Sequence, residues 1–187
     1  MKKLEVFGAT KLKGQIRISG SKNSSLPILA ATLLSDKKIS LTNLPRVKDV
    51  ETMIKLLESM GSKVKVSKNK NSLVIQNNKK IKTEASYNLM STMRAGIIVL
   101  GPLLARFGKA RVSSPGGCNI GFRPIDIHLE ALKKMGVKYK IVDGYINANV
   151  KNGLIGAKIK FPKISVGATE NLMIAACLAK GQTTLSN

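Results

Sequence analysis

Three apolar runs along the chain share one pattern, in which a helix-like segment leads into a short strand-like segment. The pairs are residues 26–34 with 39–43, residues 97–104 with 110–114, and residues 172–178 with 182–187. When Leu41, Val112 and Leu185 are taken as equivalent positions, the intervals between them are 71 and 73 residues. Recurrence at such a spacing predicts an internal repeat of about 70 residues.

The segment between one apolar run and the next also repeats. It begins with a stripe of apolar residues at helical spacing, ends at a glycine, and continues as two strand-like segments. The stripes are Val50, Met53, Ile54, Leu57 and Met60 before Gly61, and Ile125, Leu129, Leu132 and Met135 before Gly136. Asp49 is a candidate N-cap for the first stripe, and a glycine directly after a helix is a common terminator. The strand-like segments are residues 64–66 and 73–75, then 137–141 and 145–148.

Helices that alternate with strands predict an α/β (α+β) fold of repeated units with mixed strand pairing. The third unit reaches its first strand at residues 182–187 and goes no further. A repeat that stops inside a unit leaves an open sheet edge and an uncovered apolar face. We therefore expect the chain to be the front part of something longer.

The formal net charge of +22 first suggests nucleic-acid binding. However, the lysines are scattered, only 4% of residues are aromatic, and no nucleic-acid-binding motif appears. A lysine-rich solvated surface that attracts phosphorylated substrates explains the charge better. The two cysteines, Cys118 and Cys177, fit neither a disulfide framework nor a metal motif. With no export signal and no apolar run long enough to span a bilayer, we expect a cytoplasmic protein without a membrane or nucleic-acid partner.

Residues 115–124, Pro-Gly-Gly-Cys-Asn-Ile-Gly-Phe-Arg-Pro, carry the strongest chemical signal. The glycines leave the backbone around Cys118 unshielded, so that a ligand can approach closely. A guanidinium at Arg123 can hold an anion and favours the thiolate form of the sulfur. The alternative is an inert thiol in a turn. His128, the only histidine, is at least as compatible with an exposed surface position as with a role in the site.

Three further segments are candidates for anion binding. In residues 15–25, a predicted strand (15–19) is followed by a small-residue loop with Lys22 and by a helix whose first turn contains Pro27. This order of elements suits a phosphate or carboxylate, although a solvated turn lysine would look the same. Arg94 lies in an otherwise apolar predicted helix, 89–97, where it must form an ion pair or face a cleft. Residues 163–169 precede the third apolar run, and Thr169 could simply cap that helix.

Taken together, residues 19–23, 92–95, 115–126 and 165–169 resemble the UDP-N-acetylglucosamine enolpyruvyl transferases, in the same order and with similar spacing. Enzymes of this family catalyse the first committed step of peptidoglycan synthesis. The resemblance implies two similar domains, each an inside-out α/β barrel of three β-α-β-α-β-β units. It assigns residues 1–21 to the second, mostly absent domain and residues 22–187 to a truncated first domain.

The resemblance also implies roles for individual residues. Cys118 is the expected proton donor to phosphoenolpyruvate, the sulfur that adds covalently to this substrate, and the site of fosfomycin alkylation. Lys22 is the expected phosphoenolpyruvate ligand and Asn23 lies near the sugar, while Arg94 and Arg123 belong to the charged cleft. The two segments expected to line the UDP-sugar site are Arg123, Pro124, Ile125, Asp126 and Ile127, and Lys163, Ile164, Ser165 and Val166.

The resemblance implies neither a metal nor an organic cofactor. Its substrates are phosphoenolpyruvate and UDP-N-acetylglucosamine, and its catalytic base, a carboxylate, comes from the second domain. The chain is therefore expected to be inactive without the missing C-terminal half of the same enzyme. Two alternatives stay open at this point: a shikimate-pathway enolpyruvyl transferase, which the cysteine loop disfavours, and a non-catalytic basic binding protein.

Overall fold

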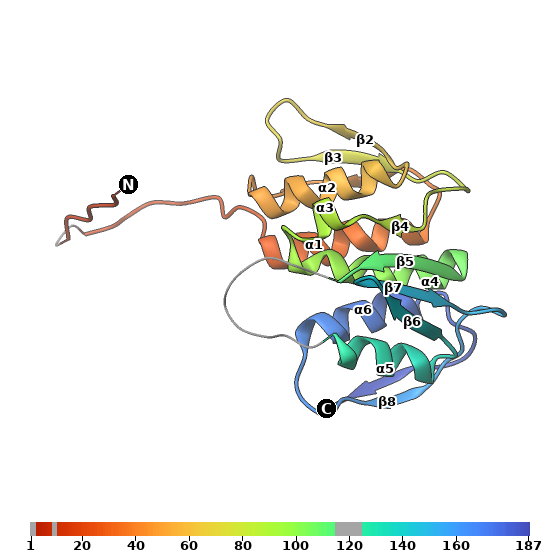
Figure 1. Ribbon diagram of the computed structural model, residues 1–187. Coiled ribbons are helices and arrows are strands. Elements are labelled where there is room, and N and C mark those ends of the chain that lie inside the picture. The colour runs from red at the N-terminus through yellow and green to blue at the C-terminus, as the bar shows by residue number, and fades with distance from the viewer. Residues whose placement is uncertain (1–2, 9–10, 115–124) are drawn as a thin grey trace.

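The computed structural model describes residues 3–8, 11–114 and 125–187 of the chain. Figure 1 shows a layered body of helices and sheets from which the N-terminal segment extends as a long arm. The first repeat contains α1 (Lys22–Ala31), the 3₁₀ turn η1 (Thr32–Leu34), β1 (Ile39–Leu41), α2 (Lys48–Ser59), β2 (Lys63–Val66) and β3 (Leu73–Gln76).

The second repeat adds one strand at its start and is otherwise similar. It contains β4 (Glu84–Ala85), α3 (Tyr87–Met90), the 3₁₀ segment η2 (Arg94–Val99), α4 (Leu100–Phe107), β5 (Lys109–Ser113), α5 (Asp126–Lys134), β6 (Lys138–Val142) and β7 (Tyr145–Asn149). The third repeat contains β8 (Lys158–Lys160), α6 (Val166–Ala176) and β9 (Thr184–Ser186).

Strand pairing confirms the repeat. In the second unit the sheet order is β4-β5-β7-β6, with β4 and β5 parallel and the other pairs antiparallel. The first unit has the matching order β1-β3-β2, and the third has the matching parallel pair β8-β9. The supersecondary unit therefore recurs along the chain, in the first and second repeats and in part in the third, as the spacing of the apolar runs predicts.

Two glycines end the equivalent helices α2 and α5 in the same way. Gly61 and Gly136 have φ values of 104° and 94°, in the left-handed region where side chains are strained. After α2, the amide of Gly61 donates to Glu58 O and that of Ser62 to Leu57 O. The amides of Gly136 and Val137 make the corresponding bonds after α5. These two hydrogen bonds satisfy carbonyl groups in the last turn of each helix and fix the turn into the following strand.

The core is formed by the helices together with buried side chains of the strands, among them Ile75, Val112 and Ile146. Helix α6 packs against α4, α5 and η2, and α1 packs against α2. Figure 1 shows the sheet of β2 and β3 above this layer and β8 below it. Leu29, Leu103, Leu104 and Leu172 have no exposed surface. The predicted inside-out α/β arrangement is thus confirmed. In the part of the chain that the structure describes, every helix is too short or too polar to cross a membrane.

Three local predictions are wrong. Residues 15–19 form no strand but belong to the arm, whose apolar side chains are at least 81% exposed: Leu4, Val6, Phe7, Leu12, Ile16 and Ile18. Asp49 is not the N-cap of α2, because the helix begins one residue earlier, at Lys48. The predicted helix 89–97 is broken after α3, where the hydroxyls of Ser91 and Thr92 donate to backbone carbonyls and so compete with helical hydrogen bonds.

Candidate functional site

The first turns of several helices lie at one end of the molecule. In Figure 1, α1, α5 and α6 all begin on the side from which the arm leaves. The first turn of α2 lies beside that of α1, because the Lys22 Nζ atom is 3.1 Å from Asp49 Oδ2. The unsatisfied amides at the start of a helix carry partial positive charge, so this end of the fold is suited to anions.

Lys22 and Asn23 are the first two residues of α1, which begins four residues before the predicted apolar run. Pro27 consequently lies inside the helix and not in its first turn. The Lys22 side chain is 48% exposed and its partner Asp49 is 37% exposed. Such a pair contributes little to stability, but it directs the ammonium group across the first turns of two helices.

Gly20 fixes the backbone that leads into Lys22. A Cβ atom at this position would lie 1.8 Å from the carbonyl oxygen of Asn43, so any side chain would force the two segments apart. Asn43 itself has a φ of 56° and follows β1. The glycine in the predicted anion loop is therefore required by the close approach of two backbones.

Arg94 begins η2 directly after the extended residue Met93, and its side chain is half-buried. Sequence analysis places it inside a helix; the structure places it at the start of one. The remaining residues of η2 are apolar and buried from Gly96 onward. Arg94 therefore lies at the edge of the helical layer and not at its centre.

The two predicted UDP-sugar segments lead into α5 and α6, and these two helices pack against each other. A groove of about 100 Å³ between α5 and the region after β8 is lined by Asp126, Ile127, Glu130, Ala131, Lys134, Ile159, Lys160, Phe161 and Pro162. Ile125 precedes α5 directly, while Lys163, Ile164 and Val166 are exposed at the start of α6. Of the predicted residues, the groove contains Asp126 and Ile127, and the second segment begins directly after Pro162, the last residue of its lining.

Ser165 determines how α6 begins. Its side-chain oxygen accepts a hydrogen bond from the amide of Ala168, so it is the N-cap. Thr169, the candidate cap from sequence analysis, instead donates its hydroxyl to the carbonyl oxygen of Ser165. Cys118, Arg123 and Pro124 lie outside the residues that the structure describes.

His128 and Asn171 are the features of this region that sequence analysis misses. His128 is only 6% exposed, contrary to the surface position considered for it, and Asn171 is fully buried. Burial lowers the pKa of His128 from 6.5 to about 4, although the nearby Asp126 carboxylate acts in the opposite direction. The sequence signal for their burial is that each residue lies on the apolar face of its helix.

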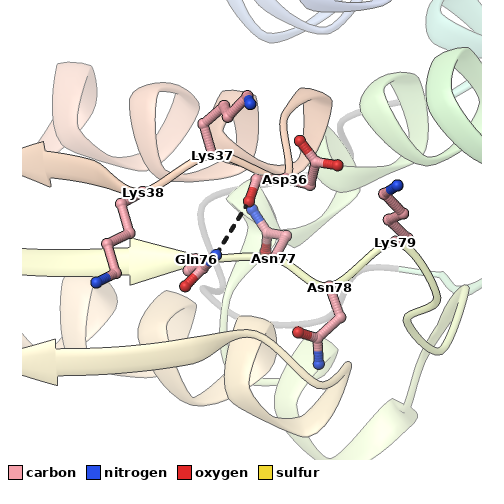
Figure 2. Close-up of a pocket in the computed structure, with 7 residues that line it drawn as sticks. All are labelled: Asp36, Lys37, Lys38, Gln76, Asn77, Asn78 and Lys79. Carbon is pink, nitrogen blue, oxygen red and sulfur yellow. Dashed lines mark hydrogen bonds between the residues drawn. The ribbon is translucent and has the colours of Figure 1, made fainter.

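A wider depression lies elsewhere and contains none of the predicted site residues. It measures about 490 Å³, is widely open, and is lined by Asp36, Lys37, Lys38, Gln76, Asn77, Asn78 and Lys79. Figure 2 shows the Gln76 side chain bonded to the backbone oxygen of Asp36. Asn77 is turned inward, where it donates to Thr32 O and Ser35 O and accepts from Ser62 Oγ. We interpret this depression as a solvated lysine surface.

Among the described residues, no group of three or more histidine, cysteine, aspartate or glutamate side chains could hold a metal ion.

Residues 6–187 match the family model for EPSP synthase (3-phosphoshikimate 1-carboxyvinyltransferase). The chain belongs to the EPSP synthase family.

Several curated relatives of the chain share one name. A UDP-N-acetylglucosamine 1-carboxyvinyltransferase of Pelagibacter ubique is 75% identical over 187 residues, which is all of this chain and 44% of the relative. The enzyme of the same name from a Sulfurovum species is 53% identical, again over all of this chain and 44% of the relative. The chain therefore spans less than half the length of these relatives, and the resemblance inferred from its motifs is confirmed.

Solved structures of an enolpyruvyl transferase and of an EPSP synthase have the same fold. The enolpyruvyl transferase NikO from Streptomyces tendae superposes with a TM-score of 0.77 at 19% identity, covering 95% of this chain and 41% of its own. An EPSP synthase from Acinetobacter baumannii superposes with a TM-score of 0.69 at 17% identity, covering 92% of this chain and 40% of its own.

Proposed function

We propose that this chain is the N-terminal part of an enzyme that transfers the enolpyruvyl group of phosphoenolpyruvate to the 3-hydroxyl of UDP-N-acetylglucosamine and releases phosphate. The observation that carries the proposal is the 75% identity, over every residue of the chain, to a relative named for this activity. The cluster of helix N-termini around Lys22 supports it, because both substrates are phosphorylated anions. The reaction would be the first committed step of peptidoglycan synthesis, carried out in the cytoplasm.

In the proposed reaction, the sugar oxygen bonds to C2 of phosphoenolpyruvate while the Cys118 thiol gives its proton to C3. The hydroxyl proton passes to a carboxylate from a second domain. In the tetrahedral intermediate that results, C3 then returns a proton to the Cys118 thiolate, and the bond from C2 to the phosphate oxygen breaks as the carboxylic acid passes its proton to the departing phosphate. The products are the enol ether and inorganic phosphate. A thiol suits the first step because its pKa can be tuned toward the working pH.

The other predicted residues bind and orient the substrates. Lys22 at the start of α1 holds phosphoenolpyruvate, with Asn23 toward the sugar, and the guanidiniums of Arg94 and Arg123 offset negative charge. The groove between α5 and the segment before α6 receives the UDP moiety. In the proposal, Cys118 is also the target of fosfomycin.

We further propose that residues 1–21 pack on a second domain and that residues 22–187 form most of the first. The exposed apolar side chains of the arm support this division, since Leu4, Phe7 and Ile16 are each at least 89% exposed. A second domain would bury them and would close over the substrates to exclude water.

A hybrid enzyme tests the function. This chain replaces the matching segment of the Pelagibacter ubique relative, and phosphate release from phosphoenolpyruvate is measured with two acceptors. We expect turnover with UDP-N-acetylglucosamine and none with shikimate 3-phosphate, which is the acceptor of the alternative, shikimate-pathway enzyme. The unaltered relative is the positive control. Turnover with shikimate 3-phosphate alone would reverse the assignment, and saturable binding without turnover would favour a non-catalytic binding protein.

A further inference from the structure

Asn171, in the middle of α6, joins three helical segments through one buried amide. Its Oδ1 atom accepts a hydrogen bond of 2.8 Å from the amide of Gly101 in α4. Its Nδ2 atom donates to Ile97 O of η2 at 3.4 Å and contacts His128 Nδ1 of α5 at 3.1 Å. A fully buried amide that reaches three elements fixes their mutual positions more specifically than apolar packing does.

These bonds determine the tautomer of His128. Because Oδ1 faces the N–H of Gly101, the Nδ2 group must face the imidazole, and it can only donate. His128 Nδ1 is therefore the acceptor, and the ring proton of the neutral imidazole is on Nε2. Reversing the amide would set donor against donor at Gly101.

Helices α4 and α6 approach so closely at Gly101 that no side chain fits between them. A Cβ atom at Gly101 would lie 2.4 Å from Asn171 Oδ1 and 2.5 Å from Asn171 O. The missing side chain of Gly101 thus lets the α4 backbone reach the amide. The network is a close-packed junction in which Asn171 contacts its partners directly.

The other edge of the His128 ring lies against the first turn of α6. A Cβ atom added at Gly167 would be at ordinary van der Waals distance from the ring, 3.6 Å from His128 Cε1 and 3.8 Å from Nε2, so the imidazole and this glycine are neighbours about one methyl group apart. His128 is itself in the first turn of α5, two residues after Asp126. The imidazole therefore separates the first turns of α5 and α6, which are the turns that carry the predicted UDP-sugar segments.

We propose that Asn171 is a positioning residue, which holds His128 as the Nε2–H tautomer and thereby sets the spacing between the first turns of α5 and α6 for UDP-sugar binding. This inference rests on the proposed function. Asn171 touches no substrate in it and acts through the histidine ring.

The experiment uses the hybrid enzyme with Asn171→Leu, which keeps the volume and removes the hydrogen bonds. We expect the KM for UDP-N-acetylglucosamine to rise about tenfold, while kcat and the KM for phosphoenolpyruvate stay within about twofold. The matched control is Asn77→Leu. Asn77 is also buried and also makes three side-chain hydrogen bonds, but in the first repeat, at the depression in Figure 2.

The control separates positioning from general stability, since each variant removes three side-chain hydrogen bonds of a buried asparagine. An equal rise of the UDP-sugar KM in both variants would overturn the inference, as would an unchanged KM in Asn171→Leu. If the parent hybrid itself turns over no UDP-sugar, the proposed function fails instead.

Two further measurements apply if Asn171→Leu does not fold. His128 is the only histidine of the chain, so ¹⁵N-histidine NMR of the 187-residue protein reads a single imidazole. We expect the proton on Nε2, and a proton on Nδ1 would overturn the inference. The isosteric Asn171→Asp keeps the acceptor for Gly101 but presents an acceptor to His128, so we expect it to transfer the ring proton to Nδ1 and to raise the same KM.

Discussion

Lowering the pH should destabilise this protein through one buried imidazole. The pKa of His128 is 6.5 when the side chain is solvated and about 4 in the folded protein, with burial as the main cause. Between these values the unfolded chain binds a proton that the folded chain does not, so stability rises with pH. The contribution of His128 is fully present above pH 6.5 and is lost as the pH falls toward about 4. A tenfold change in proton affinity is about 1.4 kcal/mol, so the total loss is about 3 kcal/mol.

The assay is urea unfolding of the 187-residue chain, followed by far-UV circular dichroism between pH 7 and pH 4. Carboxylates also titrate in this range, so the comparison is with His128→Gln, in which they are unchanged. We expect the free energy of unfolding of the parent, relative to the variant, to fall by about 3 kcal/mol across the window. A difference that stays constant from pH 7 to pH 4 would refute the argument that the imidazole is buried and neutral.

Three further predictions concern the backbone and the site. Gly20→Ala drives a Cβ into the carbonyl of Asn43, so we expect the KM of the hybrid enzyme for phosphoenolpyruvate to rise at least about tenfold; an unchanged KM would show that this loop does not hold Lys22 in place. Gly61→Ala puts a side chain at a φ of 104° and should cost about 1–2 kcal/mol in urea unfolding, whereas a neutral effect would contradict the left-handed turn after α2. Asp49→Asn breaks a half-exposed ion pair with Lys22 and should change the free energy of unfolding by less than about 1 kcal/mol, which calorimetry can check.

The repeat could be predicted from the sequence because its signals are local. Apolar spacing identified α2 and α5, and the glycines at 61 and 136 marked their ends without any knowledge of the surroundings. Strand pairing then followed from the order of the elements. The fold could therefore be predicted from local sequence signals alone.

Other features could not be predicted because they depend on contacts between distant segments. The strand-like pattern of residues 15–19 needs a partner strand, and in the described part of the chain it has none. The burial of His128 depends on Asn171, which is 43 positions away. Similarly, the break before Arg94 depends on hydroxyl groups that a periodicity of apolar residues does not register.

In the proposed function, the sulfur of Cys118 reacts with phosphoenolpyruvate. The hybrid enzyme is incubated with phosphoenolpyruvate and UDP-N-acetylglucosamine, digested and analysed by peptide mass spectrometry. We predict a mass gain on the peptide that contains Cys118, with turnover abolished by Cys118→Ser and kept by Cys177→Ser, because Cys177 is exposed at the end of α6. Full turnover in Cys118→Ser, or an adduct on Cys177 alone, would contradict the account.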